Sequence, residues 1–132
     1  MDLRLIEESL PNGFHDAYLS GLNLDFIRHH IELSLSVLVG NDDQPVSERY
    51  RQCRLTLRDY SVLVLESAVA YREIKPSEGL QIDQTQLKEE DFEFFRQAGY
   101  NIREGDSWLA LFVYDWNSRI VISARDADME LL

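Results

Sequence analysis

Cysteine and proline are both scarce in this sequence of 132 residues, which contains one cysteine and three prolines. The single cysteine, Cys53, cannot form a disulfide within the chain, so a reducing compartment is expected. Apolar runs are short, and none approaches the roughly 18 residues that a membrane-spanning helix needs. The first residues show no basic stretch followed by an apolar one, so no signal peptide is expected. These absences predict a soluble cytoplasmic protein that does not act in a membrane.

Basic residues are also few, because 13 Lys and Arg stand against 24 Asp and Glu, for a net charge of −11. A negative field opposes binding to DNA, RNA and anionic lipid, so these ligand classes are not expected. The same field favours a basic protein as a partner. Plain solubility is the alternative explanation of the charge.

The rest of the composition is that of one folded domain spanning residues 1–132. Hydrophobic residues make up 45% of the chain and aromatic residues 11%, whereas disordered chains are poor in aromatic residues. No internal repeat or low-complexity segment divides the sequence.

Alternation of apolar and polar side chains predicts two strands in the first third of the chain. Residues 31–39 alternate throughout, which is typical of a strand with one buried face. Residues 14–26 alternate less regularly, and residues 27–30 have the length of a hairpin turn. The predicted buried face of the first strand carries Phe14, Tyr18, Leu22, Leu24 and Phe26.

Further apolar segments predict the remaining strands. Residues 50–57 place Cys53 on an apolar face, where an inert core cysteine is expected rather than a reactive one. Residues 108–116 are apolar on both faces, as in a strand that is covered on both sides. The weaker candidates are 62–65, 69–71, 119–124 and an edge strand at 128–131, with a turn or bulge at 59–61.

One segment predicts a helix, at residues 87–98, with apolar residues at helical spacing and acidic residues in its first turns. Gly99 fits the position that ends a helix. The predicted fold is therefore α+β and mainly β: an antiparallel sheet of about six to seven strands with one packed helix.

Two histidine-containing stretches are candidates for reactive sites. His15 and Asp16 would point to opposite faces of a regular strand, so they predict the start of a hairpin rather than an acid–base pair. His29 and His30 are better explained as a hairpin turn than as metal ligands, whose spacing is usually wider. No metal site, cofactor or catalytic residue is predicted. Asp126 and Asp128 share a strand face, but two carboxylates are a weak cation signal.

Two sets of residues are candidates for binding. Aromatic and titratable side chains gather at predicted strand ends, where ligand sites often lie. They predict a small-molecule pocket near His15, Asp16, Tyr18, Asp115 and Trp116. The acidic helix face predicts a docking surface for a basic protein, or merely a solvated surface, at Glu89, Glu90, Asp91 and Glu93.

The segments "GFHDAYLSGLNLDF", "YRQCRLTLRDYSVLVLE" and "LALFVYDWNSRIVISARDADMEL" resemble a family of small uncharacterised bacterial proteins. Some of its members are grouped with toxin-immunity proteins. The resemblance covers residues 13–66 and 108–131 and implies no catalytic residue. It favours a non-enzymatic interaction module with an acidic surface. The alternatives are the small-molecule pocket, in a binding protein or an enzyme, and a homo-oligomer that pairs through an edge strand at 127–131.

Overall fold

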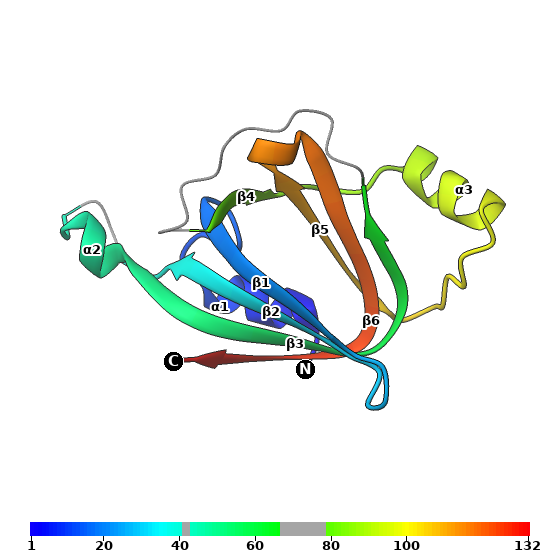
Figure 1. Cartoon of the computed structure of the whole chain (residues 1–132), viewed down its shortest axis with the longest axis horizontal. Coiled ribbons are helices and arrows are strands. Elements are labelled where there is room, and N and C mark those ends of the chain that lie inside the picture. Colours follow the sequence, from blue (N-terminus) through cyan, green and yellow to red (C-terminus); the bar gives the residue numbers. More distant parts are fainter. Residues whose placement is uncertain (41–42, 67–78) are drawn as a thin grey trace.

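A computed structural model describes residues 1–40, 43–66 and 79–132, and the elements found there are shown in Figure 1. The helices are α1 (Leu3–Ser9), α2 (Val46–Arg49) and α3 (Glu89–Gln97), with a 3-10 turn η1 (Tyr114–Trp116). The strands are β1 (Ala17–Asp25), β2 (His30–Leu38), β3 (Tyr50–Leu65), β4 (Leu80–Gln84), β5 (Ser107–Val113) and β6 (Ser118–Leu131).

The six strands form a closed barrel in the order β1-β2-β3-β6-β5-β4, and all neighbouring strands are antiparallel. This confirms the predicted mainly β fold with antiparallel pairing. The closure of the sheet into a barrel was not predicted, because alternation within each strand does not report which strands meet at the ends of a sheet. The longest ladder joins β3 to β6.

Closure depends on a short ladder between β1 and β4. Only three residue pairs join the two strands, from Ala17 opposite Ile82 to Leu19 opposite Leu80. Gly79 comes directly before this ladder with φ +84°, and a Cβ there would lie 2.7 Å from the backbone oxygen of Leu19. Glycine is therefore required at the point where the barrel closes.

A β-bulge in β1 changes which side chains face the barrel interior. The pairing with β2 shifts between Leu19 and Gly21, so Ser20 is an extra residue in the strand. As a result Leu19 is buried, while Tyr18 packs edge-on against Tyr50 with the ring centres 5.5 Å apart. The predicted inward position of Tyr18 is thus wrong.

The predicted ends of this strand also differ. Phe14 is fully buried, but it lies in the turns before β1 together with His15 and Asp16. Phe26, predicted on the buried face, is 77% exposed at the hairpin turn. The alternation therefore identified the strand but placed its first half on the wrong faces.

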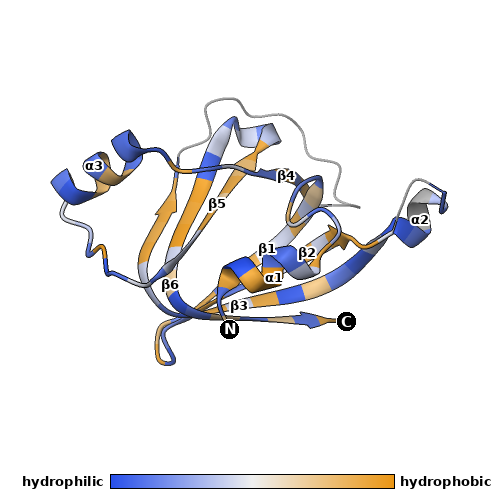
Figure 2. Cartoon of the chain, turned by 180° about the vertical axis from the view of Figure 1, so that it is seen from behind, coloured by the Kyte–Doolittle hydropathy of each residue, from blue (hydrophilic) through white to orange (hydrophobic). Residues whose placement is uncertain are grey.

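The barrel interior is filled by aliphatic side chains from every strand, and α1 completes it. Leu3 and Ile6 of α1 are buried and belong to the same apolar cluster as the inward residues of β2 and β5. Figure 2 shows α1 lying across the strands. This helix was not expected from the sequence, because only two of its seven residues are buried.

The outer face of β5 and β6 is covered by α3. Phe95 is the buried residue of α3, and its ring stacks on Trp108 with the centres 5.8 Å apart. Ala110 and Val121 complete this outer apolar cluster. The predicted helix is confirmed, and Gly99 ends it with φ +87°. The predicted strand at 108–116 is confirmed as far as Val113, whereas 114–116 form the turn η1.

A buried carboxylate ties the start of β5 to its neighbours. The side chain of Asp106 has no exposed surface and lies between Arg103 Nε at 2.8 Å and Arg125 Nε at 3.1 Å. The hydroxyl groups of Ser61 and Ser123 also donate to Asp106, at 3.0 and 3.3 Å. Paired in this way, the charge avoids the large cost of burial without a partner.

Cys53 is buried, and this burial raises the pKa of its thiol to about 11, so the expectation of an inert core cysteine is confirmed. The predicted segments 119–124 and 128–131 belong to one strand, β6, which pairs with β3. The predicted bulge at 59–61 is confirmed by a register shift after Tyr60.

The segment 69–71, predicted as a possible strand, lies outside the described residues. Among those described, no helix is long and apolar enough to cross a membrane.

The need for glycine at position 79 can be tested against a second glycine of similar backbone conformation. Gly99→Ala should lower the free energy of unfolding by about 1–2 kcal/mol, the penalty for a non-glycine residue in the left-handed conformation, because no atom lies within 4 Å of the added Cβ. Gly79→Ala should cost about 1–3 kcal/mol more, because its Cβ meets the Leu19 carbonyl. Urea unfolding of both variants measures the difference, and equal losses would contradict the proposed close approach.

Candidate functional site

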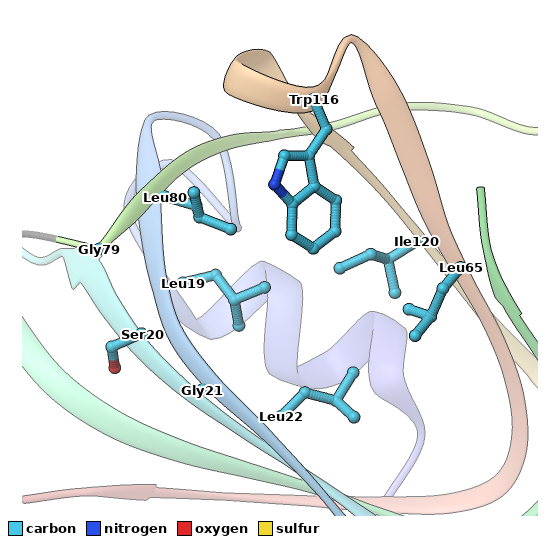
Figure 3. Close-up of a pocket in the computed structure, with 9 residues that line it drawn as sticks. All are labelled: Leu19, Ser20, Gly21, Leu22, Leu65, Gly79, Leu80, Trp116 and Ile120. Carbon is cyan, nitrogen blue, oxygen red and sulfur yellow. The ribbon is translucent and has the colours of Figure 1, made fainter. Parts of the chain in front are cut away.

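An apolar pocket of about 480 Å³ lies in the barrel where β1, β4 and the start of β6 meet, and Figure 3 shows it with α1 in the background. Most of its wall is contributed by aliphatic side chains and one indole ring. The lining residues are Leu19, Ser20, Gly21, Leu22, Leu65, Gly79, Leu80, Trp116 and Ile120.

The local structure of each element explains why these side chains converge. The bulge at Ser20 allows both Leu19 and Leu22 to contribute to the wall, although they are three residues apart. On the opposite side Leu65 and Ile120 are a cross-strand pair of β3 and β6. Because the β1–β4 ladder ends at Leu19, no described strand pairs with the rest of β1 on the side opposite β2.

Trp116 reaches the pocket from the turn between β5 and β6. Its helical turn η1 ends at Asn117, which adopts a left-handed conformation with φ 48°, and the chain then reverses into β6. Figure 3 shows the indole ring pointing into the space bounded by Leu80, Leu19 and Ile120, with its nitrogen on the Leu80 side. The predicted site residue Trp116 therefore lies in a pocket.

Polar groups in the pocket are few. The hydroxyl group of Ser20 donates to the backbone oxygen of Ser34 at 3.2 Å, so its proton is already used. No hydrogen bond of the Trp116 indole occurs among the described residues, which leaves its N–H as a donor for a bound molecule. No charged side chain belongs to the described lining.

A second cluster, made of His15, Asp83 and Tyr114, lies on the outer side of β4. His15 Nδ1 contacts Oδ1 of Asp83, and the Tyr114 hydroxyl donates to Oδ2 of Asp83 at 3.0 Å. Half of the His15 side chain is exposed. The cluster is therefore a hydrogen-bonded surface group rather than a site enclosed from water.

The neighbouring residues form a network of local hydrogen bonds. Asn12 Nδ2 donates to Oδ2 of Asp16 at 3.3 Å, and the Tyr50 hydroxyl donates to the backbone oxygen of Asp16 at 3.0 Å. Asp16 itself has a positive φ of 56°. Through these contacts Asp16 ties the turn before β1 to Asn12 and to β3.

The electrostatics of the outer cluster stabilise an ionised Asp83. Burial alone would raise the pKa of this carboxyl group, but hydrogen bonds from His15 and Tyr114 outweigh burial and lower the pKa below its usual value. The hydrogen bond to Asp83 also raises the pKa of Tyr114. At neutral pH the carboxylate is thus the acceptor and the phenol the donor.

The structure separates the residues that were predicted as one ligand site. Trp116 lines the pocket, whereas His15, Asp16 and Tyr18 lie outside its described lining, as does Asp115. Asp83 and Tyr114 were not predicted, since no local sequence pattern marks them. Asp83 is 68 residues from His15, and only the closure of β4 onto β1 brings the two together.

The predicted acidic docking face on α3 is partly neutralised within the chain. Glu89 and Glu93 lie 3.4 and 3.5 Å from the same guanidinium nitrogen of Arg96. Asp91 accepts from the backbone N–H of Lys88 at 2.8 Å and pairs with Arg119 at 3.0 Å. Glu90 is exposed, and it is the one member of the set with no contact among those described.

Neither of the weak metal signals gathers ligands. Asp126 and Asp128 both lie beside the guanidinium group of Arg58, which supplies their counter-charge. His29 Nε2 lies 2.7 Å from the backbone oxygen of Tyr60, and the two rings stack. Within the described ranges, no group of three or more His, Cys, Asp or Glu is arranged to hold a metal ion.

Comparisons of the chain with protein-family models, curated proteins and solved structures found no match in any of the three. The resemblance to small bacterial proteins therefore stays a prediction. The two sites must be judged on their own chemistry.

Tyr114→Phe tests the electrostatics of the outer cluster. Because the variant removes a hydrogen bond to the charged carboxylate, the pKa of Asp83 should rise toward its usual value. A group with a lowered folded-state pKa stabilises the fold above its unfolded pKa, and this contribution disappears as the pH falls. The variant should therefore lose less stability than the wild type on acidification.

Carboxyl ¹³C NMR titration measures the pKa of Asp83 directly. Tyr50→Phe is the matched control, because the Tyr50 hydroxyl donates to a backbone oxygen rather than to Asp83. An unchanged Asp83 pKa in Tyr114→Phe would show that the phenol contributes nothing to the ionised state.

Proposed function

We propose that this protein binds a small apolar molecule in the barrel pocket, without transforming it. The observation that carries the proposal is the size and chemistry of the hollow, which has a volume of about 480 Å³ and a described lining that is mainly aliphatic and aromatic. Small-molecule sites usually have volumes of about 300–1,000 Å³ and walls of this composition.

The energetics of the wall support a ligand. Leu22, Leu65 and Leu80 all keep part of their surface exposed, and Leu65 is 52% exposed. Covering apolar surface yields about 25 cal/mol per Å² removed from water, so a bound apolar molecule would be stabilised by each of these contacts. The lining strands are held by backbone ladders to their neighbours, which reduces the ordering needed on binding.

The position of the titratable groups favours binding over catalysis. His15, Asp83 and Tyr114 form the outer cluster and do not line the pocket. A general acid or base must lie within hydrogen-bond reach of the group that it serves. The described lining residues themselves offer apolar contact and the indole donor of Trp116.

Binding can be measured with Nile red, an uncharged dye whose fluorescence increases in apolar surroundings. The wild type should bind it saturably, with one dye per chain. Leu22→Trp should weaken binding by roughly tenfold or more, because the larger ring fills the space that gives apolar contact. Phe94→Ser is the control, since Phe94 is 62% exposed on α3 and lies outside the pocket.

Thermal unfolding shows whether Leu22→Trp is still folded, and Trp116→Ala provides a second variant if it is not. Unsaturable dye binding, or equal binding by the wild type and both pocket variants, would contradict the proposed function.

A basic protein partner is the second candidate, in keeping with the immunity-type module that the sequence suggested. The observation in its favour is an acidic tyrosine surface that includes two members of the outer cluster. It is made of Asp16, Tyr18, Tyr50, Asp83 and Tyr114. Tyrosine is enriched among residues that dominate protein interfaces. The net charge of −11 would accelerate association with a basic protein.

This candidate is tested by retaining proteins from a lysate of the source organism on the immobilised chain, and then titrating the retained protein after purification. Asp16→Asn combined with Asp83→Asn should slow its association by about tenfold or more. Glu89→Gln combined with Glu90→Gln removes the same number of charges from α3 and should have a smaller effect. The candidate fails if nothing is retained, or if binding is indifferent to salt and to the first pair of substitutions.

A further inference from the structure

The chemistry of the pocket wall points to the class of ligand, and the inference rests on the proposed function. We infer that the pocket selects an uncharged molecule with an apolar chain and a single hydrogen-bond acceptor at one end, such as a ketone, an aldehyde or an ester. Fatty carboxylates of the same length are disfavoured.

The acceptor is specified by Trp116. An indole N–H donates and cannot accept, and this donor makes no hydrogen bond among the described residues. The Ser20 hydroxyl, the other polar side chain of the wall, already donates to the Ser34 carbonyl at 3.2 Å. Among the described side chains of the wall, the indole is therefore the one available donor, located where Figure 3 shows the ring entering the pocket.

A carboxylate is disfavoured because Arg119, a described cation that adjoins the wall in sequence, is already paired. Arg119 is adjacent in sequence to the wall residue Ile120, but its Nε and Nη2 lie 3.0 and 3.1 Å from the carboxylate of Glu66. Its Nη1 lies 3.0 Å from Asp91. Each guanidinium nitrogen thus has an acidic partner on the outer side of the barrel.

A buried carboxylate would consequently lose its hydration and gain one neutral hydrogen bond. Burying an ion without a paired charge is strongly unfavourable. The net charge of −11 also repels an anion from the protein. Both effects act against anions, whereas a neutral acceptor suffers neither.

The length of the aliphatic wall indicates how the rest of the ligand lies. Leu19 and Leu22 on β1 face the Leu65–Ile120 pair, and Leu80 borders the indole. These side chains offer no polar atom, so the part of the ligand beyond the acceptor is a hydrocarbon.

The test compares three compounds with the same chain, nonan-2-one, nonane and nonanoate, as competitors of Nile red at neutral pH. Nonan-2-one should bind a few times to about ten times more tightly than nonane, the range that one neutral hydrogen bond yields. Nonanoate should bind at least about ten times more weakly than the ketone. Trp116→Phe should reduce ketone binding to the level of nonane and leave nonane binding nearly unchanged.

A second measurement uses the wild type and needs no substitution. The indole N–H signal of Trp116 in a ¹H–¹⁵N spectrum should move downfield with nonan-2-one and not with nonane. Trp108, stacked on Phe95 beneath α3, is the internal control because it lies outside the pocket. Its signal should stay in place with both compounds.

The outcomes separate the inference from the function on which it rests. If the dye binds saturably but nonanoate binds as tightly as nonan-2-one or more tightly, the inferred ligand class is wrong, while the proposed binding function stands. An indole N–H signal that does not shift when nonan-2-one binds would overturn the role of Trp116. Failure of the dye and all three compounds to bind would reject the proposed function itself.

Discussion

The ladder between β1 and β4 is the constraint on which the rest of the structure depends. Three residue pairs close the barrel, and they exist because Gly79 lets the chain pass within contact of the Leu19 carbonyl. Within the described residues the ladder ends at Leu19, next to the bulge at Ser20. The apolar pocket lies beside this end of the ladder and is lined by Leu19, Leu22 and Leu80. The same closure brings Asp83 beside His15.

Two short elements each serve both candidate sites. The inner face of β4 carries Leu80, which lines the pocket. The outer face carries Asp83, which accepts the hydrogen bonds of the outer cluster. The turn η1 also contributes to both sites, because Trp116 enters the pocket while Tyr114 donates to Asp83. Alternation along a strand and the tight 3-10 turn separate the two chemistries across a single layer of backbone. Ligand contact and surface charge can consequently be altered by different substitutions.

The extent to which this could be predicted follows from how local each signal is. The alternation of β2 is uninterrupted, and its burial pattern matches it residue by residue. In β1 one extra residue, Ser20, reverses the faces, and no propensity rule locates a bulge that depends on a partner strand. The strand β4 has five residues and was not predicted. Without it, neither the barrel nor the approach of Asp83 to His15 could be foreseen, whereas Trp116 was found because an aromatic residue in a turn is a local signal.

The charges of the protein disfavour anionic ligands both in the pocket and on the outer surface of the barrel. The outside carries an excess of carboxylates, and the arginines near the pocket and at the start of β5 are held by Glu66, Asp91 and Asp106. Since these guanidinium groups are paired, they structure the protein and do not offer a site to an anion. The inside offers hydrocarbon and one indole donor. This arrangement supports the two proposed kinds of ligand, a neutral acceptor within the barrel and a basic protein outside it, because both avoid the repulsion and desolvation that an anionic ligand would meet.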